Sequence, residues 1–271
     1  GAAVRSSVIL EHPCFQEKCH GQFGRIHLPV APKCTIQCAF CDRKYDCVNE
    51  SRPGVASKII TPKEALERTA QALQKEPRIR VAGIAGPGDP LVNRETFETL
   101  FLLRKAYPDL ILCTSTNGLM LEESVDELEE AGLDTLTVTV NAASVGTAEK
   151  IYLRVAIPGR EENSDPKELL EEFLERQQAG LFKSCEKGLT VKVNTVLIPG
   201  VNEKEIDAIA RMAQRAGAAV MNIMPMIPCG KMSSHRAPTQ EELGAARRQA
   251  ASWMRQFTFC RQCRADACGV I

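Results

Sequence analysis

The chain has 271 residues and equal numbers of basic and acidic side chains, 34 of each, so its formal charge is zero with histidine neutral. This balance produces no overall field that would draw the protein to nucleic acid or to an anionic membrane. No apolar run approaches the roughly 20 residues that span a bilayer, and the N-terminus lacks a basic-then-apolar signal pattern. We therefore expect a cytoplasmic protein with one sizeable core and with neither nucleic acid nor a membrane as its partner.

Strand and helix patterns alternate along the chain after its first 25 residues. Thr61, Pro62 and Glu64 form a helix start signal, so a helix is predicted from there to about residue 75. The segment 80–85 is short, apolar and followed by glycines, which is typical of a buried parallel strand. Further strands are predicted at 26–31, 110–115, 135–141, 189–196 and 219–224, and further helices at 94–107, 122–131, from about 202, and at 239–257, with less regular helical sequence over 145–181.

About six strand and helix units can be counted in this pattern. Parallel strands joined by right-handed helical crossovers close into a barrel, and six units give an incomplete barrel with an open side. We predict an α/β fold, a partial (β/α)6 TIM-like barrel, in one domain over residues 1–271. The barrel is expected at 26–257, with a cluster-binding N-terminal segment, 1–25, and a cluster-binding C-terminal tail, 258–271, folded over its mouth.

The twelve cysteines are too few for a disulfide-dense scaffold and more than packing requires. Half of them crowd the first fifth of the chain and three more lie in its last dozen residues, a distribution that favours metal ligation over cross-linking. The first group is Cys14, Cys19, Cys34, Cys38, Cys41 and Cys47, and the second is Cys260, Cys263 and Cys268.

Cys34, Cys38 and Cys41 form a C-x3-C-x2-C run directly after the first predicted strand. Three thiolates leave one iron of a four-iron cluster open to another ligand. The run resembles the signature of the radical S-adenosylmethionine (SAM) enzymes, which implies that SAM binds the open iron and is broken into a 5'-deoxyadenosyl radical. A zinc site, which usually shows two paired C-x2-C units, and merely buried cysteines are the alternatives.

Polar and glycine-rich segments follow the other strands, where barrel enzymes place their active sites. Gly86 and Gly88 let backbone approach a ligand closely, and in a radical enzyme Asp89 would be available to the ammonium of SAM; a simple turn is the alternative. Amides suited to a carboxylate or a ribose end three further strands, although each alone is usually a turn or capping residue. These amides are Asn117, Asn141 and Asn194.

Two more segments carry coordinating groups. Cys47 follows Cys41 by six residues and can serve another metal, with Glu50 as an acid, a base or a temporary iron ligand; a solvated loop is the alternative. Cys260 and Cys263 form a C-x2-C pair without a second pair nearby. Cys14 or Cys19 would complete the set, unless the pair belongs to a zinc knuckle.

Histidine is the remaining candidate iron ligand, because neutral imidazole binds iron less firmly than thiolate does. We expect at least one of His20 and His27 to be a ligand, and the sequence does not choose between them. His12 and His235 carry no clear signal.

Several long strings together resemble the NifB family of nitrogenase cofactor biosynthesis proteins. Besides the cysteine run, these strings are 12–14, 25–32, 43–54, 83–90, 115–118 and 260–267. The resemblance covers nearly the whole chain, and we expect the minimal form without the small carrier domain fused to some members. Cys19 stands where alanine is expected in the family, so it is either incidental or a replacement for Cys14.

The resemblance implies an enzyme that fuses two 4Fe-4S substrate clusters, with carbide insertion, into an 8Fe-9S-C precursor of the nitrogenase cofactor. One SAM would donate a methyl group, and a second would yield the radical that abstracts hydrogen from it, so the enzyme is of lyase or transferase type. The implied partners are iron–sulfur cluster donor proteins, an electron donor such as a ferredoxin or flavodoxin, and a downstream cofactor carrier or assembly scaffold. The implied ligands are Cys34, Cys38 and Cys41 for the radical cluster, Cys47, Cys113 and a histidine for one substrate cluster, and Cys14, Cys260 and Cys263 for the other.

Without the resemblance, the residues indicate only a radical SAM enzyme with extra cluster sites. Such an enzyme could make another cofactor or activate a glycyl-radical partner. A non-catalytic iron–sulfur scaffold or electron carrier is the alternative from a different class, and it would not cleave SAM.

Overall fold

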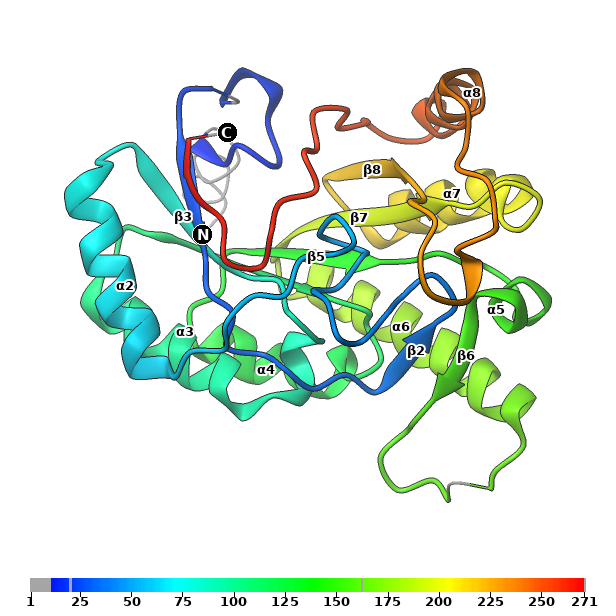
Figure 1. Cartoon of the computed structure of the whole chain (residues 1–271), viewed down its shortest axis with the longest axis horizontal. Coiled ribbons are helices and arrows are strands. Elements are labelled where there is room, and N and C mark those ends of the chain that lie inside the picture. The colour runs from blue at the N-terminus through cyan, green and yellow to red at the C-terminus, as the bar shows by residue number, and fades with distance from the viewer. Residues whose placement is uncertain (1–10, 20, 162, 271) are drawn as a thin grey trace.

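A curled seven-stranded sheet organises the computed structural model, which describes residues 11–19, 21–161 and 163–270 (Figure 1). The strand order is β8-β7-β5-β4-β3-β1-β9, in which six neighbouring strands are parallel and only β9 is antiparallel to its neighbour. The strands are β1 (Gly24–His27), β3 (Ile79–Ile84), β4 (Ile111–Thr116), β5 (Thr135–Thr139), β7 (Thr190–Leu197), β8 (Val220–Pro225) and β9 (Cys268–Val270).

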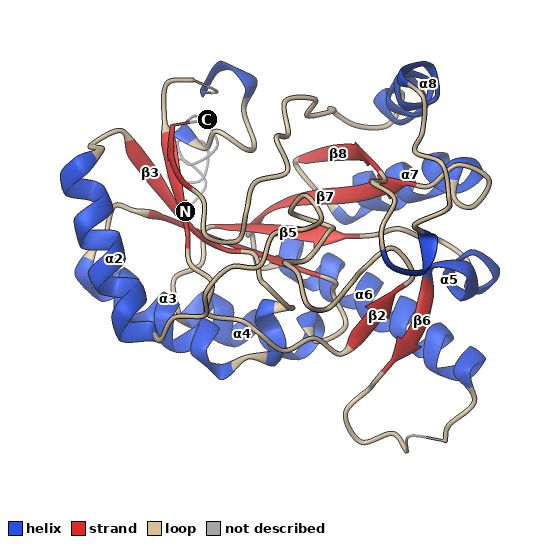
Figure 2. Ribbon diagram, in the orientation of Figure 1, coloured by secondary structure: helices blue, strands red, loops and turns tan. Residues whose placement is uncertain are grey.

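Helices connect the parallel strands and lie along the outside of the sheet (Figure 2). The six main helices are α2 (Pro62–Lys75), α3 (Arg94–Ala106), α4 (Leu121–Glu130), α6 (Pro166–Glu186), α7 (Ile206–Ala216) and α8 (Gln240–Ala251). Capping boxes begin α2 at Thr61 and α8 at Thr239, as the sequence indicates. Six parallel strands, each followed by a helix, confirm the predicted partial (β/α)6 barrel.

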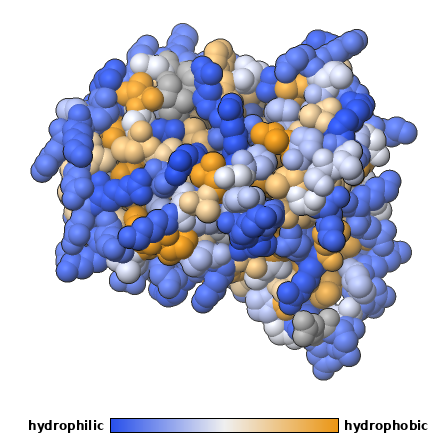
Figure 3. Space-filling model, viewed as in Figure 1, coloured by the Kyte–Doolittle hydropathy of each residue, from blue (hydrophilic) through white to orange (hydrophobic). Residues whose placement is uncertain are grey.

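The core lies between the sheet and these helices. β5 and β7 are buried along their whole length, which is the pattern of parallel strands covered on both faces. Leu136 and Val193 from the strands and Leu128 and Ile209 from the helices are fully buried in one cluster. Each such side chain stabilises the fold by about 1.5–3 kcal/mol relative to an exposed one. In the space-filling view the rim is mostly hydrophilic, with hydrophobic side chains gathered inside it (Figure 3).

A second, two-stranded sheet departs from the prediction. β6 (Tyr152–Val155) follows α5 (Val145–Ile151) and pairs antiparallel with β2 (Ile36–Cys38) of the cysteine loop. The helical prediction for 145–181 is therefore wrong over β6, because the pairing partner lies more than a hundred residues away and leaves no local signal. The remaining elements are the 3-10 helices η1 (Glu17–Cys19), η2 (Pro90–Val92), η3 (Glu203–Glu205) and η4 (Gly230–Met232).

The last helix is also shorter than predicted. α8 ends at Ala251 instead of near residue 257, because the chain turns back toward the sheet. There the Phe257 amide donates a hydrogen bond to the Met221 carbonyl of β8 at 2.7 Å. This return carries the C-terminal tail across the barrel mouth.

The two terminal segments meet over that mouth, as predicted (Figure 1). β9 pairs with β1, and Phe15 packs with Phe257 and with Val220 of β8. Arg255 donates a hydrogen bond to the Phe15 carbonyl at 2.8 Å. In the described part of the chain, no helix has the length and apolar character needed to cross a membrane.

Candidate functional site

Two adjoining pockets open at the carboxyl ends of the strands. The pocket that we name the loop pocket is lined mainly by the cysteine loop, and the one that we name the terminal pocket is lined by both terminal segments and the barrel. Glu50 and Ser115 line both pockets, so the two pockets adjoin at these side chains. The coordinating residues of the loop pocket are Cys34, Cys38, Cys41 and Cys47, and those of the terminal pocket are His12, Cys14, His27, Cys113, Cys260 and Cys263.

The loop pocket brings together the three cysteines of the C-x3-C-x2-C run. Cys38 ends β2, and the backbone then turns so that the Cys41 amide donates to the Cys38 carbonyl at 3.0 Å. Gln37 supports this turn by donating to the Cys41 carbonyl at 2.8 Å. The pairing of β2 with β6 therefore fixes the loop that presents the predicted ligands of the radical cluster.

Burial makes these thiols poor acids in the absence of metal. It raises the pKa of Cys34 to about 11 and the pKa of Cys38 well above its usual value. Bound iron would supply the positive charge that converts them to thiolates. Within residues 11–19, 21–161 and 163–270, no three histidine, cysteine or acidic side chains are gathered as ligands of one metal ion. In a four-iron cluster each thiolate binds a different iron, so the ligands do not need to converge on one metal ion.

Gly88 and Asp89 line the loop pocket, but both have internal structural roles. A Cβ on Gly88 would lie 2.1 Å from the Lys33 carbonyl oxygen, so the glycine permits contact between two backbone segments. The Asp89 carboxylate already accepts hydrogen bonds from the Asn117 amide at 2.6 Å, the Leu91 amide and the Thr116 hydroxyl. Three donors therefore already bind the Asp89 carboxylate, and its expected role toward the ammonium of SAM stays a prediction.

Gly86 and the three predicted amides do not converge on one ligand. Gly86 lines neither pocket and adopts φ +151°, a conformation that favours glycine. Asn117 lines the loop pocket, where its Nδ2 lies 3.8 Å from the Cys34 sulfur. Asn141 is fully buried and accepts a hydrogen bond from the Val196 amide at 2.9 Å. Asn194 lines the terminal pocket, where its Nδ2 donates to the Glu50 carboxylate at 3.2 Å.

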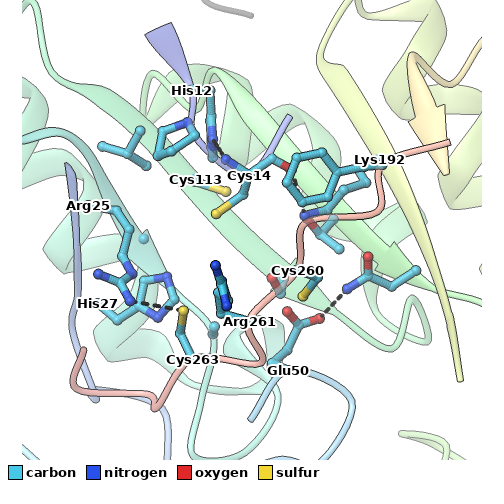
Figure 4. A pocket seen from close by; sticks show the side chains of 18 of the residues that line it. His12, Cys14, Arg25, His27, Glu50, Cys113, Lys192, Cys260, Arg261 and Cys263 are labelled. Carbon is cyan, nitrogen blue, oxygen red and sulfur yellow. Dashed lines mark hydrogen bonds between the residues drawn. The ribbon is translucent and has the colours of Figure 1, made fainter. Parts of the chain in front are cut away.

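The terminal pocket gathers thiols from three parts of the chain. Cys14 comes from the N-terminal segment, Cys260 and Cys263 from the C-terminal tail, and Cys113 from β4 (Figure 4). Burial raises the pKa of Cys14 to about 12 and that of Cys113 to about 11. Cys19 is buried and lines neither pocket, so Cys14 is the N-terminal cysteine that the structure brings to the pair.

His27 enters the terminal pocket beside Cys113 because of the sheet register. His27 on β1 pairs with Gly83 on β3, and Gly83 pairs with Cys113 on β4. Gly83 has no side chain to fill the space between them, and a Cβ there would lie 3.1 Å from the imidazole. The histidine and the cysteine therefore lie on either side of an open position.

The His27 ring is held in the state that a metal ligand needs. Its Nδ1 donates to the Arg264 carbonyl oxygen at 3.0 Å, which leaves Nε2 unprotonated. Burial lowers the pKa of His27 to about 4, so the ring is neutral at physiological pH. The other candidate, His20, lies outside the described residues.

Cys47 and Cys113, which the resemblance groups in one cluster site, line adjoining pockets. Cys47 lines the loop pocket with the three cysteines of the run, whereas Cys113 lines the terminal pocket. Glu50 lies between them, and burial raises the pKa of its carboxyl group. The two proposed ligands of one cluster therefore come from different pockets, and their grouping stays a prediction.

Sequence reasoning missed two cations and one histidine of the terminal pocket. Lys192 is buried, donates to the Cys14 carbonyl at 3.2 Å and lies 4.9 Å from the Phe15 ring centroid. Arg25 is also buried, and the Nε2 of His12 has no hydrogen-bond partner among the described residues. The period of two along a strand is the signal that could have found the cations, because Arg25 precedes His27 by two and Lys192 precedes Asn194 by two.

Comparison with known proteins identifies the family. Residues 28–213 match the model of the Radical SAM superfamily. The chain is 42% identical over 273 residues to the FeMo cofactor biosynthesis protein NifB of Methanocaldococcus infernus, with 98% of the chain and 87% of that relative covered. The chain belongs to the NifB family. Membership in the radical SAM superfamily implies a 4Fe-4S cluster and SAM as cofactors.

Other relatives of the family are longer, and a solved structure supports the fold. The NifB protein of Klebsiella pneumoniae is 43% identical over 267 residues, covering 96% of the chain and 57% of that relative. The chain spans between 53% and 62% of the length of the first three curated relatives. The crystal structure of a radical SAM methyltransferase from Sphaerobacter thermophilus matches with a TM-score of 0.58 at 18% identity, covering 90% of the chain and 70% of that structure, which shows the fold alone.

Proposed function

We propose that this chain is a radical SAM enzyme that fuses two 4Fe-4S clusters, with carbide insertion, into an 8Fe-9S-C precursor of the nitrogenase cofactor. The observation that carries the proposal is the junction of two cysteine-lined pockets at Glu50 and Ser115. A radical formed in one pocket has to reach the clusters held in the other, so the two pockets must adjoin, and they share Glu50 and Ser115. Family membership supports the same reaction class.

The loop pocket suits the radical cluster and SAM. Cys34, Cys38 and Cys41 line it, and Asn117 adds an amide beside the Cys34 sulfur. The bound cluster would supply the electron that cleaves SAM into a 5'-deoxyadenosyl radical. The protein's part is to hold three irons by thiolate, to leave the fourth open and to keep the site among buried side chains that exclude water.

The terminal pocket suits the substrate clusters. Cys14, Cys260 and Cys263 would hold one of them by three thiolates, which leaves an iron free to react. His27 and Cys113 would hold the other from the barrel side. Cys47 would complete that second set only from across the pocket junction, so we propose that this cluster lies at the junction, next to the loop pocket.

Glu50 is the acidic residue that lines both pockets. Burial raises the pKa of its carboxyl group, and Asn194 holds it by a hydrogen bond at 3.2 Å. A carboxyl group with a raised pKa keeps its proton to a higher pH than an exposed one does, which suits it to proton transfer. We propose that Glu50 moves a proton, or occupies an iron temporarily, at the place where the clusters meet.

The proposal is tested by iron content and SAM cleavage in the anaerobically reconstituted chain. We expect three four-iron clusters, about 12 iron atoms per chain, and both 5'-deoxyadenosine and a demethylated product from SAM. Cys34→Ala should abolish 5'-deoxyadenosine, and Cys260→Ala should remove about four iron atoms. Cys268→Ser is the matched control, because Cys268 is exposed on β9 and lines neither pocket.

Two results would contradict the assignment. Iron near four atoms per chain would show that the terminal pocket holds no cluster. Full conversion of clusters by Cys113→Ala and Cys260→Ala variants would show that their thiols are not ligands. The proposed cluster donors, electron donor and cofactor acceptor can then be tested by replacing the chemical iron, sulfide and reductant with candidate proteins.

A further inference from the structure

Arg25 donates a hydrogen bond from its guanidinium group to a sulfur of the terminal pocket. Its Nη2 lies 2.9 Å from the Cys263 sulfur (Figure 4). The residue is 7% exposed, so the contact is shielded from water. A guanidinium group cannot lose its proton in a protein, so this nitrogen is a permanent donor.

The backbone around Arg25 holds the guanidinium in place. Arg25 lies on β1 and pairs with Val81 of β3 on one side and Gly269 of β9 on the other. Its Nη1 donates to the Gly269 carbonyl at 3.0 Å, while Nη2 reaches the sulfur. The planar fork therefore makes two contacts at once, which the single ammonium group of a lysine would not reproduce.

The electrostatics of the pocket favour an anionic guest. Three cationic side chains line it, Arg25, Lys192 and Arg261, against one acidic side chain, Glu50. The Nε of Arg25 is buried and has no hydrogen-bond partner among the described residues. A buried donor without a partner is costly, and a bound group rich in acceptors would satisfy it.

We infer that Arg25 is a positioning residue for the substrate cluster held by Cys14, Cys260 and Cys263, acting through the Cys263 sulfur. This inference rests on the proposed function. A hydrogen bond to a ligating sulfur, together with a nearby positive charge, stabilises the reduced and more negative state of an iron–sulfur cluster. Arg25 thereby raises the reduction potential of this cluster and keeps the Cys263 side chain directed at it.

The test isolates that cluster in the intact 271-residue chain. Replacement of Cys34, Cys38, Cys41, Cys47 and Cys113 by alanine removes the other proposed thiolate ligands of the radical and barrel-side clusters. In this parent, Arg25→Met is compared with Arg25→Lys and with Arg68→Met by anaerobic redox titration followed by paramagnetic resonance. Arg68 is the matched control, because it donates to the Asp266 carbonyl of the same tail without touching a sulfur.

We expect Arg25→Met to lower the ratio of reduced to oxidised cluster at a given potential by about tenfold, a shift of about 59 mV for a one-electron couple. Arg25→Lys should shift the ratio in the same direction by a smaller factor, because it keeps the charge and loses the fork. Arg68→Met should leave the potential unchanged. Iron retained after gel filtration should fall in Arg25→Met more than in Arg68→Met.

Equal potentials in Arg25→Met and Arg68→Met would overturn the inference while leaving the proposed function intact. If Arg25→Met does not fold, Arg25→Lys decides, and an unchanged potential in that variant overturns the inference as well. A parent that binds no iron would refute the proposed cluster site and this inference with it.

Discussion

Gly88→Ala tests whether the close contact between Gly88 and the backbone of Pro32 and Lys33, just before the cysteine run, is required for the structure. The new Cβ would lie 2.1 Å from the Lys33 carbonyl oxygen and 2.8 Å from the Pro32 carbonyl oxygen. Ordinary contact begins at 3.4 Å, so the two backbones would have to separate by about 1.3 Å. Neither partner is the flexible end of a side chain, so a rotamer change cannot relieve the clash.

Separating these segments would also break the hydrogen bonds between them. The Gly88 amide donates to the Ala31 carbonyl at 2.6 Å, and the Asp89 amide donates to the Lys33 carbonyl at 2.8 Å. Overpacking costs about 1–3 kcal/mol, and a buried group left without its partner costs a similar amount. The reduced entropy of the unfolded chain returns less than about 1 kcal/mol. We expect the free energy of unfolding to fall by about 2–5 kcal/mol.

The assay is urea denaturation of the metal-free chain, followed by circular dichroism. Gly146→Ala is the matched control, since a Cβ there meets nothing within 4 Å and the residue lies in α5. The control should be unchanged or more stable by up to about 1 kcal/mol. If Gly88→Ala unfolds at the same urea concentration as the unsubstituted chain, the close contact does not constrain the cysteine loop and the reasoning is refuted.

Three further predictions concern the junction and the barrel side of the terminal pocket. Burial lowers the pKa of His27 to about 4, so between pH 7 and pH 5 the unfolded chain binds a proton that the folded chain does not, and the free energy of unfolding falls as the pH falls. Urea titrations should show that the free energy of unfolding of His27→Gln falls by about 1–2 kcal/mol less over this range than that of the unsubstituted chain. Burial raises the pKa of Glu50, so ionisation of this carboxyl group destabilises the fold as the pH rises above the pKa that Glu50 has in the unfolded chain. Glu50→Gln should therefore stabilise the protein more at pH 8 than at pH 4, and an equal gain at both would contradict a buried carboxyl group. Gly83→Ala should change the free energy of unfolding by less than about 1 kcal/mol. It should nevertheless alter the nitrogen coupling in pulsed paramagnetic spectra of the cluster-bound chain, because its Cβ would lie 3.1 Å from the His27 ring. An unaltered coupling would exclude this ring as the ligand.

The parts of the fold that the sequence predicts are those with local causes. The helix start at Thr61, with its capping box and proline, depends on four adjacent residues and is confirmed. The six strand and helix units follow from apolar runs of a few residues each. The pairing of β2 with β6 was missed because neither strand has a local signal strong enough to indicate a partner so distant in sequence.

In the candidate site too, features with local causes could be predicted, whereas features that depend on distant residues could not. The spacing of Cys34, Cys38 and Cys41 is a local property, and the three line one pocket as expected. The hydrogen bond from the Thr116 hydroxyl to the Asp89 carboxylate could not be predicted from the local sequence, because Thr116 comes from a neighbouring strand. Arg25 was overlooked for a similar reason, since its sulfur partner lies 238 positions along the chain.

The strand β9 links the entrance of the terminal pocket to the chemistry inside it. It is three residues long, lies at the edge of the sheet and pairs with β1 alone among the sheet strands. The tail that it anchors carries two of the three thiols proposed for one cluster, and its Gly269 carbonyl holds the guanidinium of Arg25. Separation of β9 from β1 would therefore open the entrance of the terminal pocket, move two of the three proposed cluster ligands away and release the arginine. Exit of the product and loss of its ligands would then occur in the same conformational change.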